Sequence, residues 1–506
     1  MLFNSFEFLI FFPIVVLIYY CIPQKIRYIW LLVSSYFFYM CWNKTYTILL
    51  AVSTVVSYIS GLLIKKVKGR ISEQETDTKI NRLLIFEKLV VAVSVLLNLG
   101  ILFFYKYTGF LIDSIFPVVK ALYPQGNFEM PMFDILLPIG ISFYTFKSIS
   151  YTIDVYRSKT EVEKNPLSYA LYVAFFPQLA AGPIERSNQM LTQIHEKHFF
   201  SQKHIRDGAL LMLWGYFQKM VIADRAAILV DQVFSHYQHY NGIQIIVAIF
   251  LFAIQIYCDF GGYSNLAIGA ASILGYKTRK NFDTPYFSDS VAEFWRRWHI
   301  SLTSWFRDYI YIPLGGNRKG TKKKYRNILI VFMASGLWHG ADWHFVLWGG
   351  LNGLYQVIAQ ILHPIREKAV KVFRIRTDTF SHKLLRVIGT FILVDIAWVF
   401  FRADSILDGF LMLGRIFMDF NIGALFNGSL YEMSLSQTEF NILILAMLLQ
   451  LFVSILEYKK FPIRSFLEKQ GFWFQFTVYL VLIFTVLVFG IYGPAFDASQ
   501  FLYFKF

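Results

Sequence analysis

The chain has 506 residues, of which 56% are hydrophobic and only 16% are charged, and its formal net charge at pH 7 is +15. Soluble domains carry about 25% charged residues, so this composition excludes an ordinary soluble protein. The basic residues gather in short loops between apolar runs, at 65–70, 318–326, 366–376 and 459–464. Loops of this kind mark the cytoplasmic side of a membrane, so the positive charge does not indicate a nucleic-acid partner.

Apolar runs recur from one end of the chain to the other, and a run of about 20 residues can cross a bilayer. The first run lacks the basic start and cleavage site of a signal peptide, so we predict a retained membrane helix. We expect segment 108–123 to be interfacial and run 242–274 to form two pieces. About 11 to 13 spans are predicted, at roughly 5–23, 27–42, 45–64, 83–105, 133–156, 167–181, 207–230, 242–274, 326–340, 343–363, 384–403, 438–457 and 472–493.

The basic loops also predict the orientation of the chain. If loops 65–82, 315–326 and 364–386 are cytoplasmic, then the N-terminus and the acidic segment 404–437 lie outside. His339 follows Arg326 by 13 residues, which places it roughly 20 Å from the cytoplasmic boundary at about 1.5 Å per helical residue. Ionisable residues at such a depth are candidates for function.

His339 belongs to the stretch "ASGLWHGADWHFVLWGG", residues 334–350. For an average histidine a structural role is the better expectation, and this applies most strongly to His344. Together with Asp342, the two histidines are close enough in sequence to be considered as metal ligands. However, their spacing matches no zinc signature, so we expect no metal site.

Residues 276–317 form an unusual block that is too charged to face lipid and too aromatic for a solvent loop. We expect short amphipathic or re-entrant helices buried in protein, where irregular backbone is tolerated at membrane depth. Ser288 or Asp289 is the predicted cap of one of these helices. His299 lies in this block directly after Trp298, as His339 follows Trp338.

Long motifs in a fixed order cover nearly the whole chain: "MLFNSFEFLIFFPIVVLIYY", "PIGISFYTFKSISYTIDVYR", "FFPQLAAGPIERSNQML", "IYCDFGGYSNLAIGAASILGYKTRKNF", "FWRRWHISLTSWFRDYIYIPLGGNR", "SGLWHG" and "WVFFRA". They resemble the membrane-bound O-acyltransferase family, and within it the bacterial branch typified by the alginate O-acetylation membrane protein. The resemblance implies an all-α ring of transmembrane helices around a central funnel. It also implies that His339 is catalytic and that His299 is the second signature residue. Two departures, Lys147 in place of glutamine and Asn352 in place of histidine, affect the expected donor or acceptor path.

The function implied by this resemblance is acetyl transfer from cytosolic acetyl-CoA to a polysaccharide outside the bacterial cell membrane, directly or through an extracytoplasmic partner protein. No bound cofactor is expected. A neutral histidine suits the task of taking the hydroxyl proton, because its pKa lies near the operating pH. We expect Trp338 and Trp343 to shield His339, and Gly336 and Gly340 to make room for substrate.

Other residues are expected to line the site, and His299, Arg296 and backbone N–H groups are candidate donors to the oxyanion.

Three alternative functions stay open: D-alanyl transfer toward teichoic acid, acetyl transfer toward peptidoglycan, and a membrane transporter with broken helices. We predict one integral membrane domain with N-terminal helices (1–130), a motif-bearing core (131–365) and C-terminal helices (366–506). The expected site-lining residues are Trp298, Arg296, Arg297, Asp308, Trp338, Asp259, Asn281 and Asn352.

Overall fold

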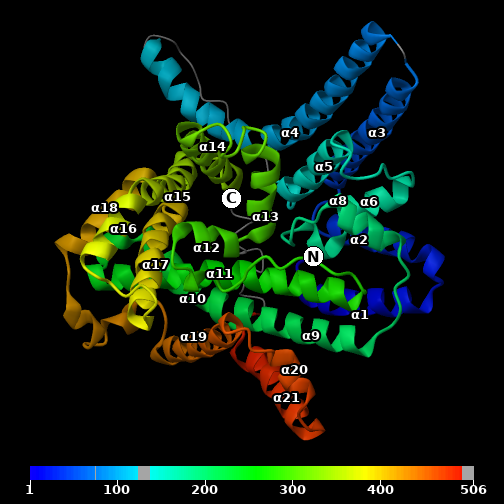
Figure 1. Ribbon diagram of the computed structural model, residues 1–506. Coiled ribbons are helices and arrows are strands. Elements are labelled where there is room, and N and C mark those ends of the chain that lie inside the picture. Colours follow the sequence, from blue (N-terminus) through cyan, green and yellow to red (C-terminus); the bar gives the residue numbers. More distant parts are fainter. Residues whose placement is uncertain (75, 124–136, 493–506) are drawn as a thin grey trace. The chain divides into compact units, whose positions relative to one another are not determined.

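The computed structural model describes residues 1–74, 76–123 and 137–492, and over these residues it consists of helices without strands (Figure 1). The first four residues of the predicted span 133–156 and the last of 472–493 lie outside the described residues. The chain divides into two compact units, Met1–Ala209 with Ala267–Arg279, and Leu210–Leu266 with Lys280–Phe506. An all-α architecture is therefore confirmed for the part of the chain that is described.

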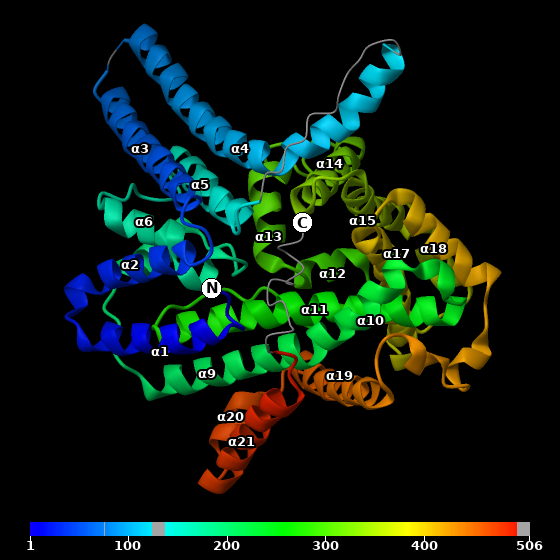
Figure 2. The same cartoon turned by 180° about the vertical axis from the view of Figure 1, so that it is seen from behind.

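The described residues of the first unit form eight complete α-helices, of which α3 and α4 run side by side (Figures 1 and 2). Helices α9 (Gln202–Tyr216) and α11 (Gly242–Ile273) carry residues of both units. The helices of the first unit are α1 (Phe6–Cys21), α2 (Arg27–Met40), α3 (Thr47–Ser72), α4 (Asp77–Leu122), α5 (Ile141–Tyr156), α6 (Pro166–Ala174), α7 (Phe176–Leu179) and α8 (Ser187–His195).

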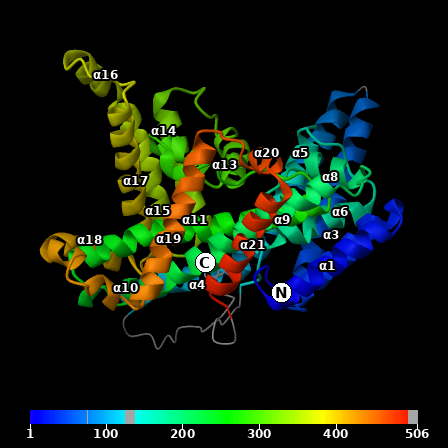
Figure 3. The same ribbon diagram turned by 90° about the horizontal axis from the view of Figure 1, so that it is seen from below.

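The second unit holds both signature histidines, and its hairpin of α14 and α15 lies against α17 (Figure 3). Two π-helical turns, Phe217–Ala223 and Arg307–Tyr311, interrupt its helices. The other helices are α10 (Asp224–Ser235), α12 (Val291–Arg297), α13 (Ile300–Phe306), α14 (Thr321–His339), α15 (Trp343–Ile361), α16 (His363–Val372), α17 (Phe380–Arg402), α18 (Ile406–Met418), α19 (Gln437–Tyr458), α20 (Ile463–Glu468) and α21 (Phe472–Phe489).

Six helices of the described chain are long and apolar enough to cross a membrane, namely α3, α4, α11, α17, α19 and α21. The count rises to seven if α15 and α16, which are bent by 48° at their junction, form one span. Many large apolar side chains on these helices are exposed, for example Leu96 on α4 and Val488 on α21. Exposed apolar surface of this kind suits a lipid environment, and the multi-pass membrane character is confirmed.

The helix bounds differ from the prediction in two places, while the expected interfacial position of 108–123 stays a prediction. Residues 242–273 form one continuous helix and not two pieces. Its glycines serve close packing, because a Cβ at Gly262 would come within 2.8 Å of the Gly215 carbonyl oxygen of α9. Residues 108–122 are the last turns of the 46-residue helix α4, which continues through Asp113 and Pro117.

The short helices expected within 276–317 are confirmed as α12 and α13, which have seven residues each. Their predicted cap is wrong, because α12 begins at Val291 and the hydroxyl of Ser290 accepts the N–H of Glu293 at 3.3 Å. Asp289 instead forms an ion pair with Arg386 at 3.0 Å. The cap therefore lies directly before the helix, as capping geometry requires.

Glycines bring α14 and α15 into close contact. A Cβ at Gly336 would clash with the carbonyl oxygen of Phe345, and a Cβ at Gly349 would clash with that of Phe332. Small residues at such crossings let helix backbones approach each other in membranes. This contact holds together the hairpin of α14 and α15, in which His339 is the last residue of α14.

We expect Gly349→Ala to lower the stability of the protein by about 1–3 kcal/mol, the usual cost of overpacking. The control is Gly389→Ala on α17, where a Cβ would meet nothing within 4 Å. Thermal unfolding of both variants in detergent measures the difference. Equal melting temperatures for the two variants would show that the hairpin tolerates a wider crossing.

Candidate active site

His339 is the last residue of α14, and its side chain lies in an aromatic pocket. Gly340 ends the helix with its N–H bonded to the Gly336 carbonyl oxygen at 3.2 Å. The imidazole centroid lies 4.9 Å from that of Trp338, 5.1 Å from Trp348 and 5.6 Å from Phe401. The residue is only 5% exposed, so its side chain is almost fully enclosed by protein.

His299 lies between α12 and α13 and is fully buried. Its φ of +42° places it in the left-handed region, which is uncommon for a residue other than glycine and often marks a functional site. Its ring packs against Phe260 at 4.6 Å and lies 6.4 Å from the ring of His339. The fold thus brings together two histidines that are 40 positions apart in the sequence.

Asn281 holds His299 in place. Its side-chain oxygen accepts from the Nδ1–H of His299 at 3.1 Å and from the hydroxyl of Ser301 at 2.9 Å. Its amide nitrogen donates to the hydroxyl of Ser264 at 3.2 Å, and its main-chain oxygen accepts the N–H of Ile300 at 2.9 Å. These bonds fix both the asparagine amide and the backbone turn at His299.

The bonds of Asn281 also determine the tautomer of His299. Because the asparagine oxygen is an acceptor, Nδ1 must carry the proton, and Nε2 of the neutral ring then has a lone pair. Burial lowers the pKa of His299 to about 3, so the ring is neutral at physiological pH. His299 therefore accepts a proton or hydrogen bond through Nε2 and does not fit the predicted role of an oxyanion donor.

A row of tryptophans in contact with one another packs against His339. Trp348 contacts His339 and stacks on Trp398 at 5.4 Å, and Trp398 in turn contacts Trp298 at 5.2 Å. Asn352 accepts from the indole N–H of Trp295 at 3.0 Å and donates to the carbonyl oxygen of Trp348 at 2.9 Å. Trp298 and Asn352 are thus connected to His339 through Trp398 and Trp348.

Two expectations about the pocket walls are wrong. Trp343 is 56% exposed and so is not part of a closed wall; the rings packed on His339 are those of Trp338, as predicted, and of Trp348 and Phe401. The space left by Gly340 is taken by the ring of Phe345, because the hairpin packs tightly there, and so it is not available to substrate. Phe401 belongs to the "WVFFRA" motif, and this motif is the feature of the sequence from which its place in the pocket could have been predicted.

The charged residues of the α12–α13 segment form local ion pairs. Arg296 and Arg297 pair with Glu293 at 3.3 and 2.7 Å. Asp308 pairs with its neighbour Arg307 at 2.9 Å. The Arg296 side chain is 71% exposed, whereas both histidines are buried, so the structure does not bring this arginine to them.

Asp259 belongs to a buried ion group that the sequence analysis did not identify. Lys219 in the first π-helical turn pairs with Asp259 at 2.6 Å and with Asp224 at 2.8 Å. All three side chains are 3% exposed. Asp259 directly precedes Phe260 on α11, and the Phe260 ring packs on His299.

The other two residues considered as metal ligands have structural roles. His344 is bonded through Nδ1 to the carbonyl oxygen of Phe400 at 2.9 Å, and Asp342 caps α15 by accepting the N–H of His344 at 3.1 Å. Among the described residues, no three His, Cys, Asp or Glu side chains form a group that can hold a metal ion.

The structure thus holds two buried histidines close together within a polytopic helical membrane protein. The sequence profile of the membrane-bound O-acyltransferase family matches residues 18–394. The chain belongs to this family and is an acyltransferase.

Its relatives include the probable alginate O-acetylase of Pseudomonas syringae, 38% identical over 82% of this chain and 75% of the relative. The probable alginate O-acetylase of Pseudomonas aeruginosa is 35% identical over 92% of this chain and 84% of its own length. The peptidoglycan O-acetyltransferase of Helicobacter pylori is 33% identical over 75% and 71%. Family membership thus agrees with the resemblance seen in the sequence motifs.

Proposed function

We propose that this protein transfers an acetyl group from cytosolic acetyl-CoA to a polysaccharide on the outer side of the bacterial cell membrane. The observation that carries this proposal is the buried pair of His299 and His339, with ring centroids 6.4 Å apart. A hydroxyl group becomes a competent nucleophile when a neutral imidazole takes its proton. Water must also be kept out, because it would hydrolyse the thioester, and the aromatic walls of the pocket serve this purpose.

In the proposed reaction His339 takes the proton of the acceptor hydroxyl as the hydroxyl oxygen attacks the thioester carbonyl carbon. The carbon–sulfur bond then breaks, and the proton passes from His339 to the departing thiolate, so that no net proton is consumed. Nε2 of His299 accepts a hydrogen bond and orients the hydroxyl group. Asn281 keeps that nitrogen deprotonated and in place.

The charge of the chain supports a cytosolic donor. Helix α14 begins with Lys322, Lys323 and Lys324 and ends at His339, and these basic residues lie on the face predicted to be cytoplasmic. Positive charge there steers an anion such as acetyl-CoA. The thin acyl-bearing arm then reaches inward by roughly 20 Å from Arg326. On the same reasoning the N-terminus and segment 404–437 lie outside, where the acceptor or a partner protein takes the acetyl group.

Alternative acceptors and donors have support from relatives. A peptidoglycan O-acetyltransferase is 33% identical, and the teichoic acid D-alanyltransferase of Bacillus subtilis is 26% identical over 57% of this chain. The alginate O-acetylases are 35–38% identical and cover more of the chain, which favours a polysaccharide acceptor. Membership of an acyltransferase family favours enzymatic transfer over the transporter alternative.

The experiment that tests the proposal uses purified protein in sealed vesicles of known orientation, with labelled acetyl-CoA supplied to one face at a time. We expect label to reach an oligosaccharide acceptor on the opposite face only when the donor is on the lysine-rich face. A D-alanyl thioester is the parallel donor. Equal activity from both faces contradicts transfer across the membrane, and preference for the D-alanyl donor contradicts acetyl transfer.

A further inference from the structure

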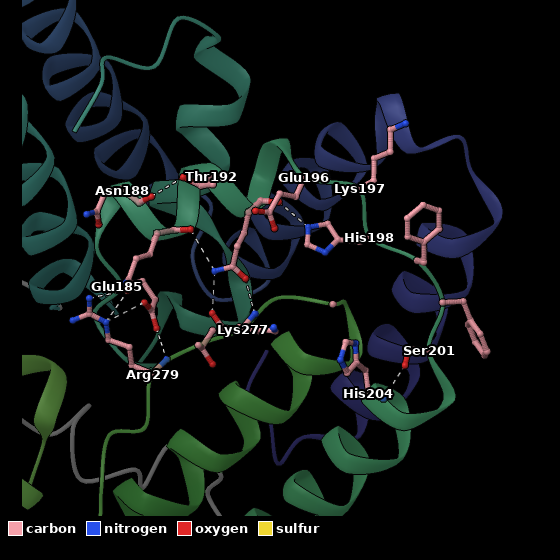
Figure 4. Close-up of a pocket in the computed structure, with 16 residues that line it drawn as sticks. Glu185, Asn188, Thr192, Glu196, Lys197, His198, Ser201, His204, Lys277 and Arg279 are labelled. Carbon is pink, nitrogen blue, oxygen red and sulfur yellow. Dashed lines mark hydrogen bonds and ion pairs between the residues drawn. The ribbon is translucent and has the colours of Figure 1, made fainter. Parts of the chain in front are cut away.

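The first unit contains an open pocket of about 810 Å³ that is separate from the histidine pair. Its walls come from residues 185–201, which include α8, from His204 at the start of α9, and from residues 275–279 after α11 (Figure 4). Gln193 joins α8 to the segment after α11. Its side chain donates to the Lys277 carbonyl oxygen at 3.0 Å and accepts the Lys277 N–H at 2.7 Å. We call this cavity the α8 pocket.

One contact joins the α8 pocket to a basic turn of its unit. Arg27, in a basic turn at the start of α2, donates to the carbonyl oxygen of His198 on the pocket wall at 2.6 Å. Lys68, in the basic end of α3, donates to the hydroxyl of Ser158 at 2.7 Å. Both basic regions are predicted to be cytoplasmic. Since Arg27 contacts the pocket wall, we expect the pocket to open at the level of the inner lipid headgroups.

Among the charged side chains that line the pocket and form no ion pair, positive charges outnumber negative ones. Lys197 and Lys277 are exposed and form no ion pair within the described part of the chain. Glu185 is occupied, since it accepts the N–H of Arg279 at 2.6 Å, and Arg279 also donates twice to Gln189. Glu196 is the remaining acidic wall residue, and the ring of His204 also lines the pocket. In Figure 4, Lys277 lies between Arg279 and His204, and Lys197 lies above His198.

Two exposed aromatic residues border the same pocket. Phe199 is 69% exposed and Phe200 is 61% exposed, and the ring of Phe200 packs edge-on against Tyr20 at the end of α1. Aromatic side chains at the ends of membrane helices sit at the headgroup level of the bilayer. A cationic pocket beside such residues faces the layer in which lipid phosphates are concentrated.

We propose that the α8 pocket binds a phosphate group presented at the cytoplasmic membrane surface, with Lys197 and Lys277 as its cationic contacts. Two sources carry this chemistry: the headgroup of an anionic phospholipid, and a phosphorylated solute such as CoA. The exposed Phe199 and Phe200 favour the phospholipid, because their rings reach the lipid interface. The proposal does not depend on acyl transfer, because it concerns binding at a separate pocket.

The test compares Lys197→Gln/Lys277→Gln with Lys159→Gln/Lys164→Gln in phosphatidylcholine nanodiscs. The control removes the same charge from exposed lysines of the same unit, near the bond between Lys68 and Ser158 but outside the pocket. Binding of short-chain phosphatidylglycerol and of CoA is measured separately by native mass spectrometry. We expect the pocket variant to bind its phosphate ligand at least about tenfold more weakly, since each lysine near an anionic surface contributes measurably to attraction.

The two binding measurements, with phosphatidylglycerol and with CoA, identify the source of the phosphate. Loss of phosphatidylglycerol binding in the pocket variant alone supports a lipid site, and loss of CoA binding alone supports a solute site. Lys197→Arg/Lys277→Arg is expected to keep binding, which separates loss of charge from loss of fold. Equal binding of both ligands by the pocket variant, the control and the wild type would overturn the proposal.

Discussion

Replacing His339 by alanine or glutamine is expected to reduce acetyl transfer by about 100- to 10,000-fold, the usual contribution of a general base. The reason is its position: a buried imidazole in a wall of aromatic rings, 6.4 Å from the second histidine. Glutamine fills much of the same space but cannot take a proton at neutral pH. The measurement is the turnover of labelled acetyl-CoA by equal amounts of correctly inserted protein.

The matched control for this prediction is His363→Gln, at a histidine whose side chain is 53% exposed. We expect this control to retain wild-type activity. His299→Ala should also lower the rate, but less than His339→Ala does. If His299→Ala proves more damaging than His339→Ala, the roles assigned to the two histidines are reversed; near-normal turnover of both His339 variants would refute the assignment of a general base.

Asn281→Asp is expected to move the acid limb of the pH–rate profile upward by about 1–3 pH units, the effect of a carboxylate beside an ionisable group. Burial lowers the pKa of His299 to about 3, and a negative charge on residue 281 raises that pKa again. Protonation removes the lone pair of Nε2, so activity is lost as pH falls through the raised pKa. The readout is kcat/KM as a function of pH, because it reports groups of the free enzyme.

The aspartate variant suits this test because it keeps every hydrogen bond of the site. Its oxygens accept from His299 and Ser301, and the hydroxyl of Ser264 turns to donate where it accepted before. Ser301→Ala is the control, since it removes one contact to Asn281 but leaves the bond to His299. A profile of Asn281→Asp that overlays the wild type would show that Asn281 does not position the reactive nitrogen of His299.

The helical, multi-pass character of this protein follows from sequence alone, because the length and composition of an apolar run decide whether a helix can lie in lipid. The same holds for the short helices of segment 276–317, since their charges forbid a lipid-facing span. The sequence also predicts His299 and His339 as candidates for function, because ionisable residues are rare at such depth and because the surrounding motifs are those of the family.

Only the tertiary structure decided which side chains meet. The roles of Phe401 behind His339 and of Lys219 beside Asp259 depend on contacts between segments far apart in the chain, which local pattern does not encode. The same is true of Asn281, whose bonds to His299 and Ser264 decide the histidine tautomer. The way α14 and α15 cross likewise decides that Trp343 is exposed and that the Phe345 ring fills the space beside Gly340. Periodicity predicts that a residue lies on a helix, but neighbours across a crossing depend on the distance and angle between helices, which packing of the whole unit determines.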